Sequence, residues 1–184
     1  IPVIILAGGK GERYESKTPK QLSIINKKPL ISHLINYLSN QGFENFIIPL
    51  GANSSKFINF FNKNKKKNFK VKNKINLKWF KAGVNITKSE RVLKSLKYFK
   101  NTNYFCVCYG DILANVNFKK SLDLLDNNKF DATLFGFYEN SNFGHIKFKK
   151  SKVLSFQEKP KMKDPINIGF YMFKSDLIKL FKNK

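Results

Sequence analysis

Cysteine, histidine and arginine are scarce in this chain of 184 residues, which contains two of each. Cys106 and Cys108 lie two positions apart, so a disulfide between them on a strand would be badly strained. His33 and His145 are far apart in the sequence, which argues against a zinc site. We therefore expect neither a disulfide framework nor a zinc centre, and we interpret both cysteines as small apolar core residues.

Acidic residues and long apolar runs are also few. The chain has 12 acidic against 35 basic residues and a formal net charge of +23. No apolar stretch approaches the roughly 20 residues that span a bilayer. The apolar start, residues 1–7, lacks the basic leader and cleavage site of a signal peptide. We therefore expect a cytoplasmic protein with no membrane partner.

The excess of lysine permits two interpretations. A basic surface attracts polyanions such as nucleic acids. The lysines are scattered along the whole chain, however, so we favour a general compositional bias and expect no nucleic-acid partner. The exception is residues 62–74, which hold seven lysines and predict a solvated surface loop. A nucleic-acid or membrane-surface contact through this segment is the alternative.

Apolar runs alternate with segments of helical periodicity along the first two thirds of the chain. Strands are predicted at 3–7, 46–50, 76–80 and 104–109, and helices at 29–42, 54–62, 88–99 and 118–128, with Ser89 as a candidate helix cap. This order predicts a Rossmann-like α/β fold with a mostly parallel central sheet and helices on both faces. Strand-like segments dominate after residue 131 and predict a smaller β-rich C-terminal part, which completes the fold or lies beside the main sheet.

A glycine-rich loop, ILAGGKGER at residues 5–13, follows the first predicted strand. Open α/β sheets bind ligands at the carboxyl ends of their strands. Gly8, Gly9 and Gly11 permit a ligand to approach the backbone closely, and Arg13 carries a planar fork suited to phosphate oxygens. The spacing matches neither the P-loop nor the dinucleotide fingerprint. The alternative is a tight glycine turn with a surface arginine.

The loop AGGxGxR followed by PKQL (19–22) resembles the nucleotide-binding signature of the sugar-phosphate nucleotidyltransferases, and the resemblance covers most of the chain. The segments FGHIKF, SFQEKP (155–160) and INIGFYMF (166–173) look most like the glucose-1-phosphate cytidylyltransferases of this family. The resemblance implies one nucleotidyltransferase domain over residues 1–184. The family's second metal-binding aspartate would lie beyond residue 184, so we expect a chain truncated at its C-terminus.

The resemblance also implies the residues of the site. It places nucleotide binding at Leu6, Ala7, Gly8, Gly9, Gly11, Arg13, Lys20, Arg91 and Gly110. It implies catalytic roles for Arg13, Lys20, Asp111 and Lys159, with Asp111 of YGD (109–111) as the ligand of Mg²⁺. It places acceptor binding at Gly144, Glu158, Lys159 and Asn167.

Charge and hydrogen-bonding capacity agree with these roles. Arg13 and Lys20 supply positive charge for a triphosphate, and Lys159 supplies it for an acceptor phosphate. Asp111 ends an apolar strand, where an unpaired carboxylate is costly, and a Mg²⁺ ion would explain its presence. The alternatives are a cap or turn role for Asp111 and an exposed surface pair for Glu158 and Lys159.

We thus predict a nucleotidyltransferase that uses Mg²⁺, with CTP favoured as the NTP and a phosphorylated sugar as acceptor, releasing pyrophosphate. Self-association into a homo-oligomer stays open. The alternative is a non-catalytic protein of the same fold that binds a nucleotide or a partner. The bulky Lys88 and Glu90 in TKSER (87–91), where the family has small residues, favour that alternative.

Overall fold

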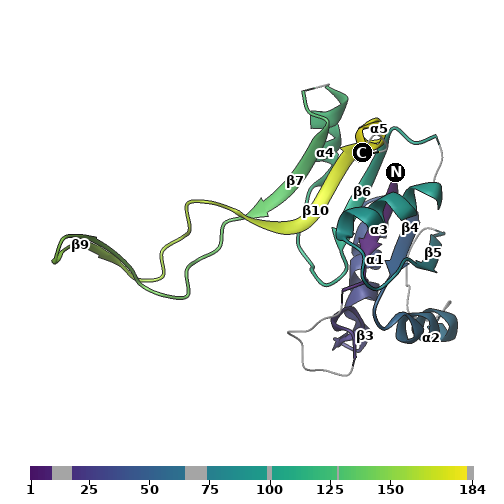
Figure 1. Cartoon of the computed structure of the whole chain (residues 1–184), viewed down its shortest axis with the longest axis horizontal. Helices are drawn as coiled ribbons and strands as arrows, with labels where there is room; N and C mark the ends of the chain where they lie inside the picture. Colours follow the sequence, from purple (N-terminus) through teal and green to yellow (C-terminus); the bar gives the residue numbers. More distant parts are fainter. Residues whose placement is uncertain (10–17, 65–73, 99–100, 128, 182–184) are drawn as a thin grey trace.

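The computed structural model describes residues 1–9, 18–64, 74–98, 101–127 and 129–181 (Figure 1). Six strands form the main sheet in the order β5-β4-β1-β6-β10-β7. The first four of these are mutually parallel: β5 (Asn76–Lys81), β4 (Asn45–Leu50), β1 (Pro2–Leu6) and β6 (Tyr104–Tyr109). β10 (Ile166–Lys174) runs antiparallel to both β6 and β7 (Ala132–Phe137). The predicted mostly parallel sheet is confirmed, and β6 has the predicted bounds.

Helices cover both faces of this sheet, as predicted. On one face, α1 (Leu30–Asn40), α2 (Ser54–Asn64) and α4 (Phe118–Asp126) share one hydrophobic cluster with the strands. On the other face, α3 (Lys88–Ser95), the short helix η2 (Leu96–Tyr98) and α5 (Leu177–Phe181) pack around a smaller cluster centred on Ile4, Phe105 and Val107. The helix η1 (Lys20–Leu22) and the small pair β2 (Ile24–Ile25) and β3 (Lys28–Pro29) connect β1 to α1.

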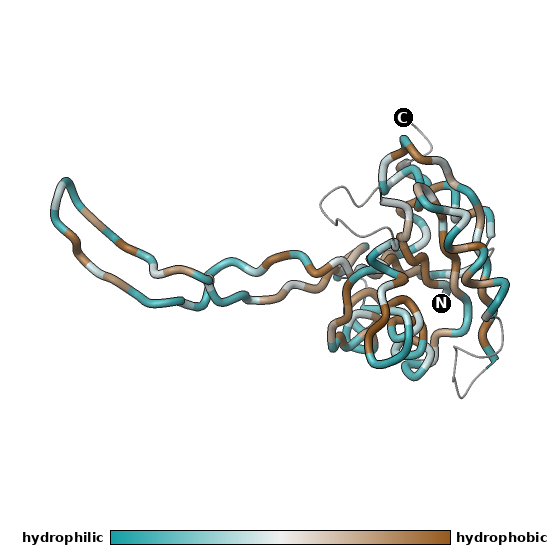
Figure 2. The backbone as a smooth tube through the Cα atoms, turned by 90° about the horizontal axis from the view of Figure 1, so that it is seen from below, coloured by the Kyte–Doolittle hydropathy of each residue, from teal (hydrophilic) through white to brown (hydrophobic). Residues whose placement is uncertain are grey.

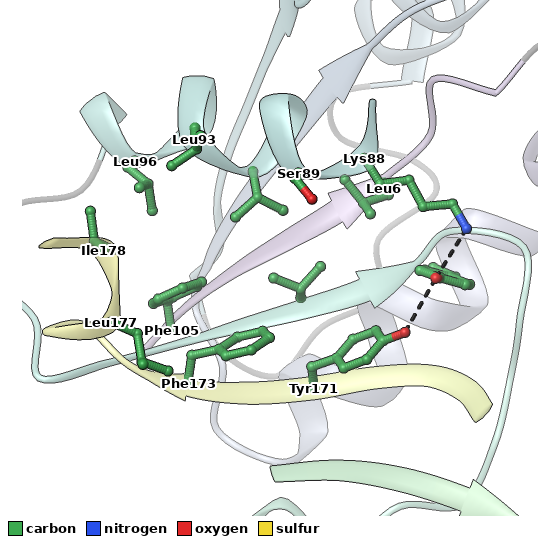
Figure 3. Close-up of a pocket in the computed structure, with 13 residues that line it drawn as sticks. Leu6, Lys88, Ser89, Leu93, Leu96, Phe105, Tyr171, Phe173, Leu177 and Ile178 are labelled. Atoms are coloured by element: carbon green, nitrogen blue, oxygen red, sulfur yellow. Dashed lines mark hydrogen bonds between the residues drawn. The ribbon is translucent and has the colours of Figure 1, made fainter. Parts of the chain in front are cut away.

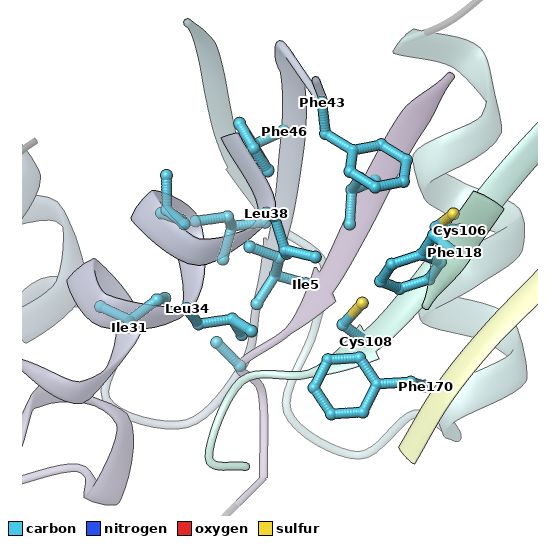
Figure 4. Close-up of a cluster of buried hydrophobic side chains, with 14 of the residues drawn as sticks. Ile5, Ile31, Leu34, Leu38, Phe43, Phe46, Cys106, Cys108, Phe118 and Phe170 are labelled. Carbon is cyan, nitrogen blue, oxygen red and sulfur yellow. The ribbon is translucent and has the colours of Figure 1, made fainter. Parts of the chain in front are cut away.

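The larger cluster shows why the apolar pattern of the sequence produces this fold (Figure 4). Helix α1 turns Ile31, Leu34 and Leu38 toward the sheet, at the three- and four-residue spacing of one helical face. Cys106 and Cys108 are free thiols, fully buried on this same face of β6. Burial raises the pKa of both thiols. Their predicted role as core residues is confirmed.

The first turn of α3 corrects the prediction that Ser89 caps this helix. The N-cap is Thr87, whose Oγ1 accepts a hydrogen bond from the Glu90 amide at 3.1 Å. In return, Glu90 Oε2 accepts the Thr87 amide at 2.6 Å. This reciprocal capping box requires a glutamate three residues after the cap, which Thr87 has and Ser89 lacks. Glu90 is bulkier than the small residues that the family has at this position. Its role in this chain is to complete the cap of α3.

The β-rich C-terminal part divides in two. β7 and β10 complete the main sheet, whereas residues 138–165, here called the arm, extend away from it (Figures 1 and 2). The arm contains the hairpin β8 (His145–Lys149) and β9 (Lys152–Gln157), and every residue of both strands is exposed. The expectation that this part completes the fold is confirmed for β7 and β10, whereas the arm does not lie beside the main sheet but extends away from it.

No helix in the described part of the chain is long and apolar enough to cross a membrane. Of the lysine-rich segment 62–74, residues 65–73 lie outside the described residues. The predicted surface loop therefore stays a prediction.

Candidate functional site

Two of the predicted site segments meet at the carboxyl edge of the parallel strands. β1 and β6 are neighbours, and Leu6 at the end of β1 pairs with Tyr109 at the end of β6. The Gly110 amide donates a hydrogen bond to the Leu6 carbonyl at 3.0 Å. Gly8 and Gly9 follow β1 at the same edge at which Asp111 follows β6. The structure therefore places the start of the glycine loop and the YGD segment together.

Lys20 and Asp111 form an ion pair at this edge. Lys20 lies in η1, and its Nζ is 3.8 Å from Asp111 Oδ2. The two side chains keep 55% and 32% of their surface exposed. Exposed pairs of this kind contribute little to stability, commonly below about 1 kcal/mol. The pair therefore contributes little to the stability of the fold. Its ammonium and carboxylate groups are both accessible to a ligand.

Arg91 lies beneath the glycine loop. Its side chain is 4% exposed, and its Nη2 donates a hydrogen bond to the Val84 carbonyl at 3.2 Å. A Cβ built on Gly8 would lie 2.2 Å from Arg91 Nη1, and one built on Gly51 would lie 2.6 Å from the same atom. Only residues without a side chain fit against the guanidinium at these two positions. Arg91 therefore supports the ends of β1 and β4 from below.

The guanidinium is also incompletely paired. Within the described part of the chain, Arg91 Nη1 is buried and has no hydrogen-bond partner. Burial lowers the pKa of Arg91, and the neighbouring Glu90 carboxylate opposes this effect. A buried cation with an unused N–H next to a glycine loop is a suitable setting for an anion. A direct contact of Arg91 with the nucleotide stays a prediction.

The sequence did not identify Gly51 as a site residue. It directly follows β4, and its Cβ would lie 2.3 Å from the Gly8 carbonyl oxygen. A glycine at the carboxyl end of a parallel strand is the signal that could have indicated it. Two other members of the predicted site, Gly11 and Arg13, lie outside the described residues.

A hydrogen-bonded group of side chains lies beside this edge (Figure 3). Lys88 Nζ donates to the Tyr109 hydroxyl at 3.0 Å, and the Tyr171 hydroxyl donates to the same oxygen at 3.2 Å. Asn167, a predicted acceptor residue, donates from Nδ2 to the Tyr171 hydroxyl. The group borders a cavity of about 290 Å³ between α3, β6, β10 and α5. Lys88, Tyr109 and Tyr171 were not among the predicted site residues.

The other predicted acceptor residues lie on the arm. A Cβ built on Gly144 would lie 3.1 Å from Glu158 Oε2, so these two residues adjoin within the hairpin. Lys159 follows β9 in a left-handed backbone conformation with φ of 45°. Because the arm extends away from the main sheet, the structure does not bring Gly144, Glu158 and Lys159 to Asp111 (Figure 1). Their acceptor roles stay predictions.

The predicted Mg²⁺ site has one carboxylate. Among the described residues, no group of three or more histidine, cysteine, aspartate and glutamate side chains could hold a metal ion. Mg²⁺ in phosphoryl-transfer sites is commonly held by one or two carboxylates together with substrate phosphates. Asp111, partly exposed beside the glycine loop, fits this mode of binding. The metal itself stays a prediction.

The amino-acid sequence of the chain is similar to those of known nucleotidyltransferases. The nucleotidyl transferase family matches residues 2–184 of the chain. The chain belongs to this family. A glucose-1-phosphate cytidylyltransferase of Salmonella typhimurium is 29% identical over all of this chain and 79% of its own length. A D-glycero-alpha-D-manno-heptose 1-phosphate guanylyltransferase of Campylobacter jejuni is 28% identical over 98% of this chain and 79% of its own length.

A solved structure agrees with the fold. HddC from Yersinia pseudotuberculosis, crystallised in complex with GMP-PN, superimposes on this chain with a TM-score of 0.71. The match covers 97% of this chain and 78% of HddC, at 22% sequence identity. The curated relatives and the family match support a sugar-phosphate nucleotidyltransferase. They differ in the base they transfer, so they do not determine the base for this chain.

Proposed function

We propose that this protein transfers a nucleotidyl group, CMP from CTP being the favoured case, to a sugar 1-phosphate and releases pyrophosphate. The observation that carries the proposal is the meeting of Lys20, Asp111 and the buried Arg91 with the start of the glycine loop at one edge of the sheet. The cytidylyltransferase relatives favour CTP, while the guanylyltransferase relative makes GTP the first competitor. We place the reaction in the cytoplasm.

The chemistry requires few protein groups. A phosphate oxygen of the acceptor attacks the α-phosphorus of the NTP, and pyrophosphate leaves with its electron pair. Lys20 would contact the triphosphate, and the backbone of Gly8 and Gly9 would let its phosphates approach closely. Asp111 would hold Mg²⁺, which when bound neutralises phosphate charge and withdraws electron density from phosphorus. The proposed role of Lys159, neutralising the acceptor phosphate, would require the arm to bring this residue to the edge of the sheet where Asp111 lies.

The decisive experiment is a matrix of the four NTPs against several sugar 1-phosphates, measured as pyrophosphate release with and without Mg²⁺. We expect the highest kcat/KM for CTP with one hexose 1-phosphate, and no release when either substrate is omitted. A preference for GTP would contradict the proposed base but not the reaction. Absence of release in every combination, despite measurable NTP binding, would support the non-catalytic alternative.

The arm supports self-association. Ile146 pairs with Phe156 and Phe148 with Val153, so these four side chains share one face of the hairpin, and each is more than half exposed. The pair Lys147 and Ser155 lies on the opposite, polar face. An isolated two-stranded hairpin is marginally stable in water at best. We propose that a second copy of the chain covers this apolar face in a homo-oligomer.

Charge placed on the apolar face should dissociate the oligomer. Phe148 is 72% exposed, so Phe148→Glu changes no buried contact within the chain. We expect the mass measured by light scattering at micromolar concentration to fall to that of the monomer. The matched control is Lys147→Glu, which adds negative charge to the opposite face of the same strand and should leave the mass unchanged. A monomeric wild-type protein, or equal effects of both substitutions, would contradict the proposal.

A further inference from the structure

Hydrogen bonds link the start of α3 to the start of β10 through four side chains. They run from Lys88 Nζ to the Tyr109 hydroxyl and from the Tyr171 hydroxyl to Tyr109, as Figure 3 shows, and from Asn167 Nδ2 to the Tyr171 hydroxyl. The Gly169 amide closes the series by donating to Asn167 Oδ1 at 2.8 Å. Tyr109 is the last residue of β6 and lies two residues before Asp111 in the chain.

The direction of each hydrogen bond follows from the chemistry of its ends. An ammonium group only donates, so Tyr109 accepts from Lys88. Asn167 must turn Oδ1 to the Gly169 amide, so its Nδ2 faces Tyr171, whose own proton is then free to go to Tyr109. As a consequence, the hydrogen bonds from Tyr171 and Lys88 lower the pKa of Tyr109. Burial and the bond donated to Tyr109 raise the pKa of Tyr171.

The backbone of β10 is shaped around Tyr109. The register of β10 against β7 shifts between Asn167 and Tyr171, and Gly169 lies inside this shift with φ of 72°. A Cβ on Gly169 would lie 2.4 Å from the Tyr109 ring. The ring therefore packs onto the irregular backbone, while the hydroxyl makes the hydrogen bonds. The two contributions of Tyr109 can be separated by mutation.

We infer that Tyr109 is a positioning residue that holds Tyr171, and through Tyr171 orients the Asn167 amide toward the sugar 1-phosphate. This inference rests on the proposed function and on the acceptor-binding role that the family resemblance implies for Asn167. Oδ1 of Asn167 serves Gly169 and one N–H serves Tyr171, so the second N–H remains for an acceptor hydroxyl. Without the Tyr109 hydroxyl, Tyr171 loses the oxygen to which it donates. The Gly169 amide still holds Oδ1 of Asn167, but the Tyr171 hydroxyl that fixes its Nδ2 is then held less firmly.

The test is Tyr109→Phe, which retains the ring against Gly169 and the Lys88 ammonium 4.1 Å from the ring centroid. We expect the KM for the sugar 1-phosphate to rise about 3- to 10-fold, the range that one hydrogen bond supplies. The KM for the NTP should stay within about twofold, because the series of hydrogen bonds ends at Asn167 and does not include the glycine loop. A general loosening of the fold would raise both KM values.

Two further variants show whether Tyr109 acts through Asn167. In an Asn167→Ala background, Tyr109→Phe should cause no additional loss of acceptor affinity, measured by calorimetry, because the oriented group is already absent. The matched control is Tyr104→Phe, at the other end of β6, where the hydroxyl donates to Asp126 instead. This control should leave both KM values unchanged.

The possible results distinguish a failure of the positioning role from a failure of the proposed function. Turnover by the wild-type protein with an unchanged acceptor KM in Tyr109→Phe overturns the positioning role alone. Additive losses in the double variant, or the same KM change in Tyr104→Phe, also overturn it. Absence of turnover by the wild-type protein with every NTP and sugar phosphate overturns the proposed function and this inference together.

Discussion

Asp111→Asn is expected to lower Mg²⁺-dependent turnover by at least about 100-fold while leaving the protein folded. Asp111 has a partly exposed carboxylate beside the glycine loop, and triphosphate oxygens bound there carry charge of the same sign. A bridging cation converts this repulsion into attraction, and asparagine binds Mg²⁺ far more weakly than aspartate does. Nucleotide binding without Mg²⁺ should therefore be unchanged or tighter in the mutant.

The measurements are pyrophosphate release as Mg²⁺ is titrated, NTP affinity in the presence of a chelator, and the unfolding midpoint. Because the Lys20–Asp111 pair is exposed, we expect the free energy of unfolding to change by less than about 1 kcal/mol. Asp123→Asn, an exposed carboxylate on α4, is the matched control and should retain wild-type turnover. An unfolded Asp111→Asn protein together with metal-independent nucleotide binding in the wild type would make Asp111 a structural residue.

Gly51→Ala is expected to destabilise the protein by about 1–3 kcal/mol, the usual cost of forcing a methyl group into a filled space. The new Cβ would lie 2.3 Å from the Gly8 carbonyl oxygen, which is backbone and cannot rotate away. Either β4 or the start of the glycine loop must shift. Nucleotide affinity should therefore fall together with stability, because Gly8 lies in the proposed phosphate-binding loop.

The melting temperature should fall by several degrees, since about 1 kcal/mol corresponds to roughly 2–4 °C for a domain of this size. Gly9→Ala is the matched control for stability: a Cβ there meets no atom of the described residues within 4 Å, so we expect a change within about 0.5 kcal/mol. Equal melting temperatures for the two variants would show that the loop yields without cost. The close approach of Gly51 to Gly8 and Arg91 would then contribute nothing to the stability of the protein.

Local pattern sufficed for most of the elements. β6 was predicted with its observed bounds because a strand buried on both faces is apolar along its whole length. The first turn of α3 was assigned incorrectly because serine and threonine are both good caps. Glu90, the residue that decides between them, had been interpreted as a departure from a nucleotide-binding motif.

The candidate site was predicted in part, on motif resemblance. Lys20, Asp111, Gly8 and Gly110 were chosen for their chemistry and their motifs, and the structure brings them to one edge of the sheet. Gly51 and Tyr109 were not predicted because their roles depend on contacts with residues that are distant in the sequence. The local sequences GAN (51–53) and CYG (108–110) do not indicate that Gly51 lies against Gly8. They also do not indicate that the Tyr109 hydroxyl accepts hydrogen bonds from Lys88 and Tyr171.

The sequence by itself determined the alternation of strands and helices, the parallel start of the sheet and the family, because these follow from periodicity and short contiguous motifs. Only the tertiary structure decided which strands after residue 131 join the main sheet. β7 pairs with β10 although the whole arm separates them in the sequence, and β8 pairs with β9 away from the main sheet. Strand pairing at long separation depends on which apolar faces meet in space, and the periodicity of a single strand does not specify its partner.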